Sequence, residues 1–101
     1  MRLSAQQVSA IVQATRDLAG PGAQVRLFGS RVHDGLSGGD IDLLVECAMP
    51  VERPVWLAAQ ITARLQRALG DRKIDVLVID PTTVLQPVHH IARANGLVLS
   101  A

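Results

Sequence analysis

Two periods of apolar residues alternate along the chain. One is the three-to-four-residue spacing of a helix with a buried side, and the other is the alternation or short apolar run of a strand. Helical spacing covers Ser4 to Leu18, Pro54 to Leu69 and Thr83 to Ala94. Strand patterns cover Gln24 to Phe28, Asp40 to Glu46 and Arg72 to Asp80. With one helical turn expected from Ser30 to Gly35, the order α-β-α-β-α-β-α predicts an α/β (α+β) domain, a small mixed sheet flanked by helices.

Residues that start and stop helices agree with these boundaries. Ser4 and Gln7 have the spacing of a capping box, and the glycine-proline-glycine sequence from Gly20 ends the first helix. Pro54 suits the first turn of the second helix, where its missing N–H costs nothing, and Gly70 ends that helix.

Each helix is expected to bury one apolar stripe. The three stripes are Val8, Ile11, Val12, Thr15 and Leu18; Trp56, Leu57, Ile61, Leu65, Ala68 and Leu69; and Val84, Leu85, Val88, Ile91 and Ala92. His89 and His90 point about 100° apart on a helix and do not converge on one ion, so we expect a surface position with a partial core contact. Leu97 to Leu99 is expected to form a short edge strand or a partner contact.

Length and composition narrow the class of protein. The 101 residues suffice for one domain, 1–101, with a single modest core. A net charge of +1, with one Trp and one Phe, disfavours nucleic-acid binding, which relies on basic patches and stacking rings. Cys47 is the only cysteine and is expected to be a buried residue at a strand end. Because no segment approaches the roughly 18 apolar residues of a membrane span, a cytoplasmic protein without membrane contact is expected.

Two aspartates at the start of the second strand are candidate metal ligands. Side chains alternate along a strand, so Asp40 and Asp42 share one side with Leu44 and Glu46. Residues two apart on a strand have Cα atoms about 6.5 Å apart. Both carboxylates can therefore hold one Mg²⁺ or a pair of metal ions.

The break after the first strand is a candidate triphosphate site. A nucleoside triphosphate needs backbone N–H donors at close range and a divalent cation held by oxygen ligands. Gly29 removes the side chain that would block the phosphates, and Ser30 offers a hydroxyl group and the start of a helical turn. Arg31 is expected to contact phosphate or to form a structural ion pair, because arginine serves both uses.

A third carboxylate interrupts the apolar run of the last strand. Asp75 lies inside that strand, where a buried charge is costly unless something compensates it, as a bound metal would. Asp71 and Asp80 are the alternatives, but both lie at strand edges where a carboxylate costs little. The burial argument therefore favours Asp75, provided that its strand lies beside the strand of Asp42.

The residues from Gly29 to Glu46 resemble a known signature. Gly-Ser, a glycine-containing loop and Asp-x-Asp on a strand are similar to the pattern of the nucleotidyltransferases related to DNA polymerase β. In so short a chain, they resemble the minimal nucleotidyltransferase (MNT) domain, the antitoxin of HEPN/MNT toxin-antitoxin pairs. The resemblance implies the nucleotidyltransferase fold, with Gly29, Ser30 and Arg31 at the triphosphate and Asp40 and Asp42 as metal ligands.

The resemblance also implies a reaction and a partner. Asp75 would complete the metal site and take the proton from the attacking hydroxyl group. Two Mg²⁺ ions would assist the transfer of AMP from ATP to a hydroxyl group, such as a tyrosine of a HEPN-type toxin. A competing hypothesis is a binding module of the same fold that neutralises its toxin by complex formation alone.

Overall fold

The computed structural model describes residues 3–29, 40–70 and 72–100. Its elements are α1 (Ala5–Ala19), β1 (Gln24–Phe28), β2 (Ile41–Glu46), α2 (Pro54–Leu69), β3 (Ile74–Ile79), α3 (Pro87–Asn95) and β4 (Leu97–Val98). The four strands form one sheet in the order β3-β2-β1-β4, in which only β2 and β3 run parallel. The predicted α+β class with a small mixed sheet is confirmed. The helical turn predicted between Ser30 and Gly35 lies outside the described residues.

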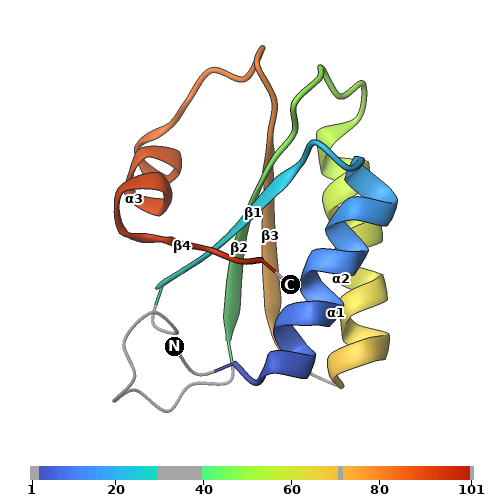
Figure 1. Cartoon of the computed structure of the whole chain (residues 1–101). Helices are drawn as coiled ribbons and strands as arrows, with labels where there is room; N and C mark the ends of the chain where they lie inside the picture. Colours follow the sequence, from blue (N-terminus) through green and yellow to red (C-terminus); the bar gives the residue numbers. More distant parts are fainter. Residues whose placement is uncertain (1–2, 30–39, 71, 101) are drawn as a thin grey trace.

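The sheet is the middle of three layers, as Figure 1 shows. α1 and α2 lie side by side on one face, and α3 covers part of the other. The main core lies between the sheet and the α1/α2 layer and includes Ile11, Leu27, Ile41, Leu43, Ile61 and Leu65. A smaller cluster under α3 consists of Leu44, Ile79 and Ala92, with Phe28, Leu77 and Leu85 packed against it.

Alternation along β2 follows the prediction. Its contributions to the main core are Ile41, Leu43 and Val45. Leu44 belongs instead to the cluster under α3. Because successive side chains of a strand point to opposite faces, Asp42 and Glu46 lie on the α3 face with Leu44. That face therefore carries two acidic side chains of β2, one on each side of a buried leucine.

The first helix has the predicted ends. Ser4 Oγ accepts a hydrogen bond from the Gln7 N–H at 3.1 Å, and Gln7 Oε1 accepts one from the Ser4 N–H at 2.8 Å. The helix stops at Gly20, whose φ of +98° is a conformation that glycine adopts without steric cost. Ile11 and Thr15 of the predicted stripe are buried, and the Thr15 hydroxyl group donates to the Ile11 carbonyl oxygen at 2.9 Å.

The second helix starts at Pro54 and stops before Gly70 as predicted, but it buries a narrower stripe. Its buried residues are Leu57, Ile61 and Leu65. Trp56 is 59% exposed and Ala68 is also exposed, so the prediction that both are core residues was wrong. Trp56 precedes Leu57 by one residue, so it points about 100° away from the buried stripe.

The last helix begins at Pro87, and the predicted start at Thr83 was wrong. Proline at the first helical position lacks an N–H that the helix does not need, and it disfavours helical geometry at the preceding Gln86. His89 Nδ1 accepts a hydrogen bond from the Gln86 N–H at 2.9 Å, so this ring caps the helix start. His89 is half-buried and His90 is exposed, as expected for a helix surface with a partial core contact.

Most of the apolar stripe predicted for this last helix is exposed. Ala92 is buried and Leu85 is half-buried, but Val84, Val88 and Ile91 are exposed. The predicted burial of those three residues was wrong. Val84 precedes α3, and α3 buries only its Ala92 side, against Leu44 and Ile79, so Val88 and Ile91 stay exposed.

The remaining sequence predictions concern strand ends. β4 is the predicted edge strand, and its Leu97 pairs with Leu27 and its Val98 with Arg26. Cys47 is buried directly after β2, and burial raises the pKa of its thiol. Within the described ranges, no helix combines the length and the apolar character that a bilayer crossing requires.

Candidate functional site

Parallel pairing of β2 and β3 brings two of the predicted aspartates together. Asp42 is the register partner of Asp75 on β3, and it is also the partner of Phe28 on the antiparallel neighbour β1. Paired residues of neighbouring strands project to the same face of a sheet. Asp42 and Asp75 therefore share the face on which α3 lies.

Negative charge exceeds positive charge around the Asp42 carboxyl group. Burial raises the pKa of the Asp42 carboxyl group, the negative charges of Asp75 and Asp40 raise it further, and so does a hydrogen bond with Asp75; Lys73 acts in the opposite direction. Neighbouring negative charges disfavour the charged form of the Asp42 carboxyl group. A divalent cation bound there would neutralise the negative charge of these carboxylates.

Gly29 lies directly against Asp42. Its φ is +77°, in the region that glycine favours, and a Cβ atom built there would overlap Oδ2 of Asp42 and lie 3.1 Å from its Cγ. Any larger residue would therefore strain the backbone and displace the Asp42 carboxylate. The absence of a side chain at position 29 leaves room for that carboxylate, a purpose beyond the phosphate access expected from the sequence.

Asp40 is exposed and lies immediately before β2, where its charge acts on Asp42. The donor set of Asp40, Asp42 and Asp75 consists of hard carboxylate oxygens, which is what Mg²⁺ binds. Among the described residues, however, no three His, Cys, Asp or Glu side chains are already grouped to hold a metal ion. Asp42 and Asp75 are the paired part of the site.

The burial argument that favoured Asp75 was wrong. Its side chain is 53% exposed, and one carboxylate oxygen lies 4.0 Å from the Lys73 ammonium nitrogen. β3 is an edge strand of the sheet, and Asp75 lies near its start, so a carboxylate there stays in contact with water. The condition that its strand lies beside that of Asp42 is met by the register.

Three of the sequence candidates have no described position. Ser30 and Arg31, expected at the triphosphate, lie outside the described residues, and so does Asp71. Their roles stay predictions.

Asp80, the other alternative to Asp75, has a structural role at the opposite end of β3. Its carboxylate accepts hydrogen bonds from the N–H groups of Val51 at 2.6 Å and Thr82 at 2.7 Å, and from the Thr82 hydroxyl group at 2.6 Å. These bonds lower the pKa of Asp80 to about 2. Asp80 therefore fixes the turn that follows β3, and its backbone N–H donates to Thr83 Oγ1.

We expect Asp80→Asn to lower the urea midpoint of unfolding at pH 7, because the amide accepts fewer of these hydrogen bonds. A carboxylate whose pKa falls on folding stabilises the fold above its unfolded pKa of about 4. That contribution is lost as the pH falls towards the folded value of about 2. The difference between the two proteins should therefore narrow from pH 5 to pH 2.5. A constant difference would contradict the assignment.

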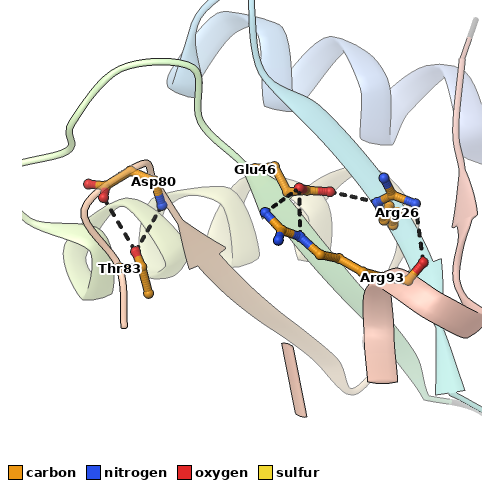
Figure 2. Close-up of polar contacts among 5 residues, drawn as sticks. All are labelled: Arg26, Glu46, Asp80, Thr83 and Arg93. Carbon is orange, nitrogen blue, oxygen red and sulfur yellow. Dashed lines mark hydrogen bonds and ion pairs between the residues drawn. The ribbon is translucent and has the colours of Figure 1, made fainter. Parts of the chain in front are cut away.

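Glu46 holds an ion triad that the sequence did not reveal. Figure 2 shows its carboxylate between two guanidinium groups, Arg26 of β1 and Arg93 of α3. Glu46 Oε1 lies 2.6 Å from Arg26 Nε, and Oε2 lies 3.0 Å from an Arg93 terminal nitrogen. Arg26 also donates to the Arg93 carbonyl oxygen at 3.4 Å. The triad ties α3 to the sheet at the end of β2 away from Asp42.

Two cavities border the described residues away from the aspartates. One of about 210 Å³ lies at the outer edge of β3, between Val55, Leu77 and His89. Another of about 340 Å³ lies between the turn at Pro21 and the loop at Pro50. Neither is lined by Asp40, Asp42 or Asp75, and the lining of both is mainly apolar.

Removing the charge of Asp42 is expected to stabilise the protein when no divalent cation is present. A carboxyl group with a raised pKa contributes stability while it is protonated, and this is lost as the pH rises through its folded pKa. Because both side chains of the pair are partly exposed to water, Asp42→Asn should gain roughly 0.5 kcal/mol at pH 7, about 2–4 °C in melting temperature. The gain should shrink at pH 4 in a thermal melt. A less stable variant at pH 7 would contradict the charge excess.

Comparisons with known proteins identify similar solved structures. No protein-family model matches the chain, and no curated protein matches it significantly. A crystal structure of a toxin-antitoxin with AMP-PNP is 22% identical, with a TM-score of 0.70, over 93% of this chain and 73% of that chain. A mutant of the toxin-antitoxin MntA-HpeT, in which two aspartates two positions apart are changed to glutamate, is 20% identical with a TM-score of 0.69, over 93% of this chain and 72% of that chain.

A third match is a structure from Shewanella oneidensis, 15% identical with a TM-score of 0.63, over 97% of this chain and 73% of that chain. At such identities the likeness establishes a shared three-dimensional arrangement and no more. The chain has the nucleotidyltransferase fold.

Proposed function

We propose that this protein is a Mg²⁺-dependent nucleotidyltransferase that moves AMP from ATP to a hydroxyl group, a tyrosine, of a HEPN-type toxin, and so acts as a cytoplasmic antitoxin. The observation that carries the proposal is the pairing of Asp42 and Asp75 across two parallel strands, with Gly29 against Asp42. Carboxylates on adjacent strands beside a side-chain-free turn are what a metal-assisted phosphoryl site requires.

The similar structures support the same reaction class. One is a toxin-antitoxin with AMP-PNP, a nucleotide of the adenosine series. Another carries substitutions at two aspartates spaced like Asp40 and Asp42 of this chain. Both belong to complexes between a toxin and its antitoxin, which supports a toxin as the partner.

Each site residue has a chemical task in the proposed reaction. Asp40 and Asp42 would hold Mg²⁺, with Asp75 completing the set. Bound Mg²⁺ would supply neutralisation of the triphosphate and of the departing pyrophosphate. The hydroxyl oxygen of the toxin bonds to the α-phosphorus, and Asp75 accepts the proton of that hydroxyl group. The bond from the α-phosphorus to the oxygen that bridges it to the β-phosphate breaks, and pyrophosphate leaves. Gly29 leaves the backbone open towards the phosphates.

The test uses the protein with the toxin encoded beside it. The two proteins are incubated with Mg²⁺ and ATP labelled at the α-phosphate, and the toxin is then analysed by mass spectrometry and for activity. We expect the mass of one or more AMP groups on a toxin tyrosine and loss of toxicity in step with it. Neutralisation of the toxin with no added mass would overturn the transferase proposal and favour a binding module.

A further inference from the structure

One side of α3 exposes large apolar side chains next to the acidic part of the sheet. Ile91 is 57% exposed and Val88 is 43% exposed, although both lie on the only described helix of this face. Exposed apolar residues that cluster on one side of a helix commonly mark a binding surface.

The ion triad fixes the rotation of α3. Arg93 reaches from α3 to Glu46, as Figure 2 shows. Ala92 is buried in one cluster with Leu44 and Ile79. Residues of an α-helix follow each other at 100° intervals. Ile91 therefore lies on the other side of Ala92 from Arg93, about 200° from it, and Val88 lies about 40° from Ala92 on the Ile91 side.

That direction leads towards Asp42. On β2, Glu46 and Asp42 lie on either side of Leu44, each about 6.5–7 Å from it along the strand. Since Arg93 points to the Glu46 end, Ile91 and Val88 point to the Asp42 end. α3 lies on this face of the sheet, opposite α1 and α2, as Figure 1 shows.

The sheet continues this apolar row. Phe28, the cross-strand partner of Asp42, is half-buried on the same face, and so is Leu77, two residues after Asp75. Phe28 therefore lies in the same cross-strand row as Asp42 and Asp75, and Leu77 lies in the next row along the strands. Both guanidinium groups of the triad are bound to Glu46, and the proposed function places the phosphates at Gly29 and Asp42 instead.

We propose that the band formed by Phe28, Leu77, Val88 and Ile91 is the subsite for the base of the bound nucleotide. The inference rests on the proposed function, because a triphosphate held at Gly29 and Asp42 leaves its nucleoside to extend along the same face. A planar base packs favourably between an aromatic ring and aliphatic side chains. These apolar side chains would contact the flat surfaces of the base and would form no hydrogen bonds with its edges.

The test separates binding of the base from binding of the phosphates. Binding of ATP and of inorganic tripolyphosphate, each with Mg²⁺, is measured by calorimetry for the wild type, Ile91→Asn, Ile91→Leu and Met49→Asn. Met49 is an exposed apolar residue of the loop after β2, at the end of that strand away from Asp42, and serves as the control. Loss of an apolar contact with the base should weaken ATP about tenfold or more. Tripolyphosphate binding should stay the same in every variant, and Ile91→Leu should retain the affinity for ATP.

The outcomes distinguish this inference from the proposed function. If ATP does not bind the wild type, the proposed function fails and the inference with it. If ATP binds and Ile91→Asn leaves its affinity unchanged, the base subsite alone is overturned. Equal weakening of ATP and tripolyphosphate would also overturn it, because the change would then act through the fold. So would loss of toxin binding with unchanged ATP affinity, which would identify the band as a protein contact.

Discussion

Asp42→Asn is expected to reduce AMP transfer by on the order of 10³-fold, because it removes a charged group that the reaction depends on. The substitution keeps the size of the side chain, and metal-free protein should be at least as stable as the wild type. Binding to the toxin should be retained. The measurement is the initial rate of labelled AMP incorporation into the toxin at saturating Mg²⁺.

The matched control is Asp17→Asn. Asp17 is an exposed aspartate of α1 that pairs with Arg64 of α2 at 2.5 Å, on the layer opposite the site. The chemical change is identical, and the transfer rate should stay within about twofold of the wild type, as for surface substitutions away from special features. If Asp42→Asn transfers AMP as fast as Asp17→Asn, the carboxylate pair is not the catalytic centre.

Gly29→Ala is expected to destabilise the protein more than Gly20→Ala or Gly70→Ala and to abolish transfer. The positive φ alone costs about 1–2 kcal/mol for a residue with a Cβ atom. The new methyl group must also displace the Asp42 carboxylate, which occupies its place. The free energy of unfolding from urea titration and the transfer rate measure the two effects.

Gly20→Ala and Gly70→Ala are the controls for Gly29→Ala. Both glycines have a positive φ, at +98° and +88°, but an added Cβ atom meets nothing within 4 Å at either position. Their cost should therefore reflect backbone strain alone. In a double-mutant cycle, Asp42→Ala should recover part of the excess cost of Gly29→Ala, a coupling of about 0.5–3 kcal/mol for residues in contact. No excess cost would contradict the close approach of Gly29 and Asp42.

Local rules were sufficient for most element boundaries and failed where burial depended on neighbours. β1 and α2 have the predicted ends, because glycine, proline and capping residues act through the backbone nearby. Trp56 and Ile91 were placed in the core by their spacing, yet both are exposed. A helical period identifies an apolar side, but the partner that covers it comes from distant parts of the chain.

The sequence suggested which residues form the candidate site, but only part of the physical reasoning behind that choice agrees with the structure. The spacing of Asp40 and Asp42 on one strand follows from the alternation of side chains, which depends on sequence alone. Asp75 was favoured because a buried charge needs compensation, whereas its side chain is half-exposed on an edge strand. The register places Asp75 opposite Asp42, but the burial argument for Asp75 was wrong, and its role in a site stays a prediction.

The sequence by itself determined the periods, the turns and the kinds of side chain available, because these depend on residues within a few positions of one another. Tertiary structure alone decided that β3 lies parallel to β2 with Asp75 opposite Asp42, and that Gly29 makes room for a carboxylate. It also decided that Glu46 joins Arg26 to Arg93, residues 67 positions apart. Such contacts are set by how strands and helices pack across long stretches of chain, which no local pattern specifies.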